Sequence, residues 1–249
     1  MAIEIEQRQL AGLPIAVATL EQATQTLCEW AIERRPGDVH LINAYSVALA
    51  DSDLEYRRNL SDAFCNFPDG KPLSWATALS RAPLSQVRGP SIFEGTMSEG
   101  RAHGVRHFLL GSTPETLAAL QTSLEARYPG VNIVGYESPP FRALSESELY
   151  AQDERIRACQ PHMVWVGLGT PKQDHEVARL AKSGFLAVAV GAAFDFSAGT
   201  KPEAPSWMTR VGLEWVFRLA SEPKRLWRRY LFGNIRFIWA LAANSGGKR

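Results

Sequence analysis

Short apolar stretches recur along the chain, separated by longer segments in which apolar residues follow a helical period. The apolar stretches are rich in β-branched and aromatic residues, as is typical of strands buried in a sheet. The longer segments begin with helix-capping patterns, in which Ser or Thr stands three residues before Glu or Gln. The expected strands lie at residues 15–17, 39–44, 64–67, 105–110, 131–136, 163–167 and 185–190. The capping pairs are Thr19 with Gln22, Ser52 with Glu55, Ser112 with Glu115, and Ser145 with Glu148.

Strands that alternate with helices predict an α/β fold, a Rossmann-like sandwich with a largely parallel sheet. A chain of 249 residues can bury such a core without disulfides or a structural metal. The three cysteines are scattered and form no CxxC pair, so we expect a reducing, cytoplasmic environment. We expect no secretory signal peptide, and the apolar run at residues 237–243 is far shorter than the roughly 20 residues that span a bilayer.

Charge is divided unevenly along the chain, although its net charge is only +1. Residues 201–249 carry ten Lys or Arg against three Glu, whereas residues 1–200 carry 17 basic and 23 acidic side chains. The basic segment also contains four of the seven tryptophans. We therefore divide the chain into an α/β domain, residues 1–200, and a basic, Trp-rich helical appendage, residues 201–249. We expect the domain to fold without the appendage.

One face of the expected C-terminal helix is apolar and lies beside arginines. Trp227, Leu231, Ile235, Ile238 and Trp239 share that face. Such a pattern suits an anionic membrane surface, since the cations meet lipid phosphates and the rings lie at the headgroup level. We expect the appendage to associate with a membrane; a helix packed on the body with a solvated basic face explains it equally well. No nucleic-acid-binding motif accompanies the charge, so we expect no nucleic-acid partner.

Polar side chains stand at the ends of four expected strands, most of them beside glycine. The carboxyl ends of parallel strands gather at one edge of a sheet, where ligands bind. Glycine lets a ligand approach the backbone, and the helices that follow direct N–H groups at anions. The polar residues at these ends are Asn43, Asp69, Gln173 and Asp195.

Two patterns that suggest cofactors are better explained by local structure. Asp51-Ser52-Asp53 resembles the DxD pattern that holds a metal–nucleotide in many enzymes. We expect Ser52 to cap a helix, with Asp53 in its first turn, where a carboxylate favours the helix dipole. Gly167-Leu168-Gly169 is half of a dinucleotide fingerprint, which the following proline interrupts. We therefore expect neither a metal nor another cofactor.

Motifs in a fixed order resemble those of the WecG/TagA/CpsF glycosyltransferases over nearly the whole chain. They are Asp69-Gly70 after a strand, Gly167 to Gln173, Val190 to Gly199, Ala204 to Trp207, and Gly212 to Leu226. The resemblance, to N-acetylmannosaminyltransferase-like enzymes, implies an inverting hexosyltransferase. It implies transfer from a UDP-sugar to a polyprenyl-pyrophosphate-linked sugar, for teichoic acid, enterobacterial common antigen or exopolysaccharide, at the inner face of the plasma membrane. Glu203 departs from the family, which usually has a basic residue there.

The resemblance and the chemistry of the residues together indicate roles. Pro68-Asp69-Gly70 by itself favours a simple turn, and the resemblance makes Asp69 the expected base for the acceptor hydroxyl. Arginines and helix N-termini would stabilise the charge on the leaving UDP. The remaining candidates are Asn43 and Gln173 for sugar or acceptor hydroxyls, Tyr136 and Asp195 for uracil and ribose, Arg88 for the pyrophosphate, Arg218, Arg225 and Arg228 for UDP, and Gly70, Gly111 and Gly169 for close backbone approach. The alternative explanation is local capping for Asn43, Gln173 and Asp195, and an ordinary surface charge for Arg88.

Two other classes of protein stay open at this stage. One is a different nucleotide-using α/β enzyme such as a dehydrogenase, which the incomplete glycine pattern disfavours. The other is a non-catalytic, membrane-peripheral nucleotide-sugar-binding protein, which would tolerate the loss of Asp69. A homo-oligomer is compatible with each of these interpretations.

Overall fold

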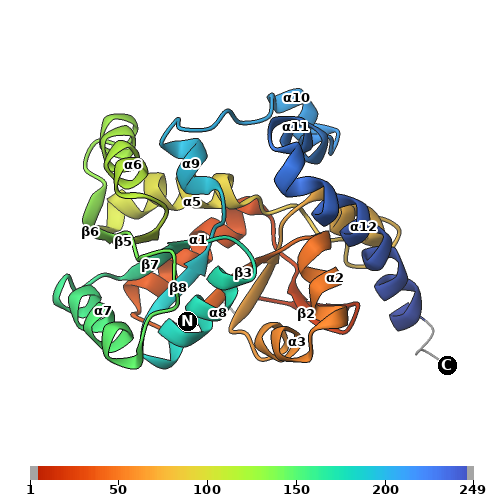
Figure 1. Cartoon of the computed structure of the whole chain (residues 1–249), viewed down its shortest axis with the longest axis horizontal. Helices are drawn as coiled ribbons and strands as arrows, with labels where there is room; N and C mark the ends of the chain where they lie inside the picture. The colour runs from red at the N-terminus through yellow and green to blue at the C-terminus, as the bar shows by residue number, and fades with distance from the viewer. Residues whose placement is uncertain (1–4, 246–249) are drawn as a thin grey trace.

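A six-stranded parallel sheet forms the centre of the molecule (Figure 1). The computed structural model describes residues 5–245. Its central strands pair in the order β4-β3-β8-β7-β5-β6, all in the same direction, which confirms the predicted fold class. The strands are β3 (Gly37–Ile42), β4 (Cys65–Pro68), β5 (Arg106–Gly111), β6 (Asn132–Glu137), β7 (Met163–Gly167) and β8 (Leu186–Ala189).

An antiparallel hairpin of β1 (Gln7–Leu10) and β2 (Leu13–Ala16) precedes the first helix. Its turn consists of Ala11 and Gly12, both at positive φ, as a two-residue hairpin turn requires. The prediction found only the second strand, because the first contains three polar residues and a single leucine. The hairpin adds no strand to the central sheet.

Helices cover both faces of the sheet, so the central strands are apolar on both sides. Trp165 and Val188 face a core that includes side chains of α1, α5 and α6. Val166 and Ala187 face the opposite core, beneath α7 and α8. The helices are α1 (Leu20–Ile32), α2 (Ala44–Ser52), α3 (Leu54–Ser61), α4 (Lys71–Thr77), α5 (Gly89–Glu99), the 3₁₀ turn η1 (Gly100–His103), α6 (Pro114–Arg127), α7 (Glu146–Ala158), α8 (Lys172–Lys182), α9 (Ala193–Ser197), α10 (Ser206–Arg210), α11 (Glu214–Ser221) and α12 (Pro223–Ser245).

The helix caps agree with two of the predicted pairs and correct the other two. Thr19 and Ser145 close full capping boxes with their partners. In contrast, α3 is capped by Asp53 rather than Ser52, and α6 by Thr113 rather than Ser112. Ser52 still belongs to α2, and Ser112 has a positive φ of 58°. Neither serine therefore has the extended backbone that an N-cap needs.

The helices of the C-terminal segment differ in how much they bury against the α/β domain. Helix α12 runs alongside α2 (Figure 1), and its Phe237 and Ala240 are buried in one cluster with Ile42 and Val47. Helices α10 and α11 bury no residue at all. The appendage of residues 201–249 is therefore partly built into the core of the α/β domain.

The apolar face predicted on α12 points to solvent. Ile238 is 65% exposed and Trp239 is 71% exposed, and the other three side chains of that face are exposed as well. The face that packs on the body is a different one, formed by Leu226, Gly233, Phe237 and Ala240. No helix among residues 5–245 is long and apolar enough to cross a membrane.

Candidate active site

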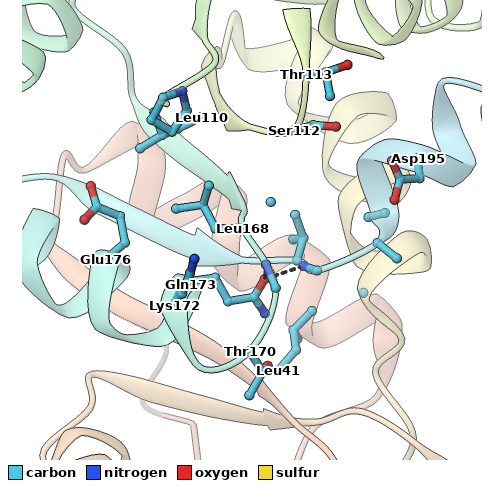
Figure 2. Close-up of a pocket in the computed structure, with 18 of the residues that line it drawn as sticks. Leu41, Leu110, Ser112, Thr113, Leu168, Thr170, Lys172, Gln173, Glu176 and Asp195 are labelled. Carbon is cyan, nitrogen blue, oxygen red and sulfur yellow. Dashed lines mark hydrogen bonds between the residues drawn. The ribbon is translucent and has the colours of Figure 1, made fainter. Parts of the chain in front are cut away.

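A cavity of about 590 Å³ opens at the carboxyl edge of the sheet. Its wall includes residues that follow β3, β4, β7 and β8, the loop of residues 139–144, and side chains of α11 and α12. Figure 2 shows Lys172 and Gln173 at the start of α8, and Asp195 on α9, among the residues that line it. Seven predicted site residues meet in this cavity: Asn43, Asp69, Gly169, Gln173, Asp195, Arg218 and Arg225. Five others do not line it: Gly70, Arg88, Gly111, Tyr136 and Arg228.

Asp69 follows β4 and is fixed by the neighbouring strand. Its backbone N–H donates a 2.6 Å hydrogen bond to the carbonyl oxygen of Ile42. Burial raises the pKa of its carboxyl to about 6, and the negative Glu214 adds to the rise. Arg88, Arg218 and Arg229 act in the opposite direction. A carboxylate with a pKa near neutrality can both take a proton and give it up again at physiological pH.

Gly70 connects Asp69 to α4 with a backbone that other residues rarely adopt. Its φ is +109°, so a side chain at this position would be strained. Gly70 therefore shapes the Asp69 loop from outside the cavity. This differs from the predicted role, in which its backbone approaches the substrate.

Asn43 and Gln173 both use their side-chain oxygens to hold local structure. The Asn43 oxygen accepts hydrogen bonds from the backbone N–H groups of Tyr45 and Ser46 and thereby caps α2. The Gln173 oxygen accepts from the N–H groups of Gly169 and Gly191, both at 3.0 Å, and so joins two strand-end loops (Figure 2). The capping interpretation is therefore correct for both oxygens. Both residues line the cavity. Because their side-chain oxygens are already occupied, the amide nitrogen is the group with which each side chain would bind a ligand.

A buried ionic network lies directly behind Gln173, and the sequence analysis did not identify it. His40 on β3 contacts Asp174 at 3.1 Å and Asp38 at 2.9 Å. Tyr56 and Asn59 of α3 donate to the side chain and the carbonyl of Asp174. The two carboxylates raise the pKa of His40 to about 9 against the opposing effect of its burial. The network ties the first turn of α8, and with it Gln173, to the sheet.

Two arginines of the C-terminal helices place unpaired positive charge in the cavity. Arg218 of α11 and Arg229 of α12 form no ion pair with any residue in the described part of the chain. Arg229 stacks 4.3 Å from the ring centre of Tyr45, and burial, together with the nearby Arg218, lowers its pKa. Arg225 also lines the cavity but pairs with Glu222. Unpaired, partly buried guanidinium groups are suited to bind phosphate oxygens.

Arg229 replaces Arg228 among the candidates. Arg228 is exposed and lies over the ring of Trp227 at 5.2 Å, on the solvent side of α12. Arg229 follows Leu226 and precedes Gly233 at helical spacing, and both of these residues are buried against the body. Because the burial of Leu226 and Gly233 is known only from the fold, the sequence alone does not favour Arg229 over Arg228.

Arg88 is an internal ion-pair partner rather than a surface charge. Its Nε donates to Glu214 at 2.9 Å and its Nη2 to Glu203 at 2.7 Å. Only 14% of its side chain is exposed. Glu214, which lines the cavity, was also missed by the sequence analysis. Glu203, the residue that departs from the family pattern, therefore balances an arginine of the α/β domain.

The remaining candidates have structural explanations. A side chain at Gly111 would collide with the backbone of Gly167, so this glycine permits the close pairing of β5 and β7. Tyr136 on β6 is 44% exposed and lies outside the cavity wall. Asp195 lines the cavity and is paired with Lys201 at 2.9 Å.

No group of three or more His, Cys, Asp or Glu residues that could hold a metal ion occurs among residues 5–245. In the DxD-like pattern, the carboxylate of Asp53 accepts hydrogen bonds from the backbone N–H groups of Glu55 and Tyr56. The charged groups that face the cavity include the three arginines described above, Lys172 and several carboxylates.

The sheet is open and parallel, and the charged cavity lies at its carboxyl edge, where α/β proteins bind their ligands. The family model described as "Glycosyl transferase WecG/TagA/CpsF family" matches residues 8–249, nearly the whole chain. The chain therefore belongs to the WecG/TagA/CpsF glycosyltransferase family. It is a glycosyltransferase of cell-surface polysaccharide synthesis, and it acts on a nucleotide-sugar donor and an acceptor.

Proposed function

We propose that this protein is an inverting hexosyltransferase that moves a sugar from a UDP-sugar to a polyprenyl-pyrophosphate-linked sugar. The observation that carries the proposal is the content of one cavity: the carboxyl of Asp69, with a pKa near 6, together with the unpaired guanidinium groups of Arg218 and Arg229. A base and a cationic diphosphate site are the two parts that such a reaction needs.

In the proposed reaction, Asp69 takes the proton from the acceptor hydroxyl as its oxygen attacks the anomeric carbon. The new glycosidic bond forms on the face opposite the departing diphosphate, so the configuration inverts. The bond between the anomeric carbon and UDP breaks, and Arg218 and Arg229 stabilise the negative charge that develops on the diphosphate. The amide nitrogens of Asn43 and Gln173 donate to sugar or acceptor hydroxyls.

The proposal requires no metal ion, because the arginines carry out the charge stabilisation that Mg²⁺ or Mn²⁺ provides in metal-dependent transferases. We expect transfer to continue at an unchanged rate in excess EDTA. A loss of activity that added Mg²⁺ or Mn²⁺ restores would contradict this part of the proposal and would point back to Asp51 and Asp53.

The proposed acceptor is membrane-bound, so the enzyme has to reach the bilayer surface. The exposed apolar face of α12 and the exposed Arg228 and Arg236 beside it provide a basic, Trp-containing surface for an anionic membrane. We therefore propose peripheral binding at the inner face of the plasma membrane.

The experiment that tests the function is a screen of UDP-sugars with a short-chain polyprenyl-pyrophosphate sugar, in which UDP release, product mass and, by NMR, the anomeric configuration of the product are followed. We expect one UDP-sugar to release UDP only when the acceptor is present, with inversion at the anomeric carbon. Tight binding of UDP-sugars without transfer to any acceptor would favour a nucleotide-sugar-binding protein instead.

A further inference from the structure

Helix α11 is held against the α/β domain by charges at both of its ends. At its start, Glu214 accepts a hydrogen bond from Arg88, which precedes α5. Just past its end, Glu222 pairs with Lys201 at 3.1 Å, and Lys201 also pairs with Asp195 of α9. The helix buries none of its own residues. The helix also packs on α12, where Trp215 contacts the ring of Tyr230, and these ion pairs add links from α11 to the α/β domain.

The position of α11 matters because this helix carries cavity residues. Glu214 and Arg218 stand one helical turn apart and both line the cavity. Arg218 in turn lies 5.7 Å from the ring centre of Phe196, another cavity residue. A rotation or outward movement of α11 would therefore remove one of the two unpaired cations from the proposed diphosphate site.

Three nitrogens of Arg88 are already engaged within the protein. Nε donates to Glu214, Nη2 to Glu203, and Nη1 makes a long contact of 3.5 Å with the hydroxyl of Ser91. The guanidinium thus joins the loop before α5 to two points of the C-terminal segment, Glu203 before α10 and Glu214 at the start of α11. A planar fork can hold two carboxylates in this way, whereas a lysine ammonium cannot reproduce the same geometry.

We propose that Arg88 is a positioning residue, which acts through Glu214 to hold α11 over the cavity so that Arg218 faces the donor diphosphate. Lys201 performs the same task at the other end of the helix, through Glu222. The two ion-pair groups form an electrostatic latch, which we define as Arg88 with Glu203 and Glu214, and Lys201 with Asp195 and Glu222. The role of the latch in catalysis rests on the proposed function. That the latch holds α11 in place does not depend on the proposed function.

Hydrogen exchange of the full-length protein without ligand tests directly whether the latch holds α11 in place. In Arg88→Gln, we expect amide exchange in residues 213–222 to rise by about tenfold or more, since the lost hydrogen bonds involve charged groups. Exchange in the central strands should stay as in the wild type. Lys201→Gln should loosen the same segment. Arg157→Gln, which breaks an exposed ion pair on α7, is the matched control and should leave residues 213–222 unchanged.

Calorimetry of UDP binding to the same variants shows whether Arg88 acts by positioning α11 or by contacting UDP directly. We expect Arg88→Gln to weaken UDP binding together with the loss of protection in α11, and Arg88→Lys to recover only part of both. The double variant Arg88→Glu with Glu214→Arg should restore part of the protection.

Weaker UDP binding with unchanged exchange in α11 would show that Arg88 contacts the ligand itself and would overturn the proposal. Unchanged exchange and unchanged binding would overturn it as well. A wild-type protein that binds UDP but transfers no sugar would contradict the proposed function and leave the exchange result standing.

Discussion

Asp69 shows how a common turn residue acquires an uncommon pKa. Pro68-Asp69-Gly70 closes β4, and the bond from its N–H to Ile42 holds the loop against β3. Burial opposes ionisation of the carboxyl, Glu214 opposes it further, and the nearby arginines keep the pKa from rising beyond about 6. The residue type is ordinary, and its surroundings make it a candidate base.

Asp69→Asn should lower the turnover number by about 10²-fold or more, the scale of general-base catalysis, because the amide cannot accept the proton. Folding and UDP binding should stay close to those of the wild type. The measurements are steady-state transfer rates, UDP calorimetry and thermal unfolding. Near-normal turnover in this variant would remove Asp69 from the role of base.

The pH dependence of transfer should reflect the same carboxyl. The base works only when it is ionised, so kcat/KM should fall as the pH drops through about 6, well above the range of an ordinary aspartate. The measurement is the pH profile of kcat/KM for the UDP-sugar at saturating acceptor. An acid limb near pH 4 would mean that a carboxyl with an ordinary pKa controls the reaction.

Arg229 and Arg228 provide a matched pair of neighbours with different surroundings. Arg229→Gln should weaken UDP binding by about tenfold or more, since hydrogen bonds to charged groups contribute roughly 1.5–3 kcal/mol. Arg228→Gln should bind UDP as the wild type does, because Arg228 lies on the solvent side of the helix. Calorimetry with UDP measures both. Equal losses in the two variants would indicate a general charge effect rather than a contact from Arg229.

At the scale of elements, α12 has two different faces. Leu226, Gly233, Phe237 and Ala240 face the body, and Arg229 enters the cavity from the same side. The opposite side exposes apolar side chains, among them Leu231 at 55% and Ile235 at 50%. An exposed apolar face flanked by arginines is typical of helices that lie in a membrane surface.

Reversal of two charges on the exposed face, Arg228→Glu with Arg236→Glu, should weaken binding to anionic liposomes by at least about tenfold at low salt. Each cation near such a surface contributes roughly 1 kcal/mol. The difference should shrink as salt is added, because screening weakens both proteins' electrostatic attraction. The double variant Arg155→Glu with Arg157→Glu, on α7 of the α/β domain, is the control. Wild-type liposome binding by the α12 variant would contradict the proposed membrane surface.

At the scale of the whole molecule, the C-terminal helix helps to complete the core. Phe237 is 5% exposed and Ala240 is 1% exposed, in a cluster that also contains Leu13 and Ile15 of the hairpin and Tyr56 of α3. Helix α12 therefore covers apolar surface of the α/β domain. The contact argues against residues 1–200 as a body whose stability is independent of the appendage.

Truncation after Glu222 should therefore lower the melting temperature strongly and expose apolar surface. Burial of a large apolar side chain contributes about 1.5–3 kcal/mol, and domains have only about 5–15 kcal/mol in total. Phe237→Ala alone should cost roughly 3–5 kcal/mol, whereas Trp239→Ala, on the exposed face, should cost little. Thermal and denaturant unfolding measure these changes. A truncated protein as stable as the full chain would show that α12 does not contribute to the stability of the α/β domain.

The sequence by itself determined the alternation of strands and helices, since apolar periodicity and capping patterns are local signals. It also located Asn43, Asp69, Gln173 and Asp195 correctly at one edge of the sheet, because parallel strands bring their carboxyl ends together. The motifs in fixed order indicated the family that the comparison then identified.

Only the tertiary structure decided which charges face the cavity and which face each other. Arg225, Arg228 and Arg229 lie within about one helical turn, so the spacing of the arginines themselves does not set which of them points inward; the packing of Leu226 and Gly233 on the body does. The partners of Arg88 lie 115 and 126 residues further along the chain, beyond the reach of any local pattern. Ion pairs between distant residues depend on how the elements pack, and that packing exists only in the folded chain.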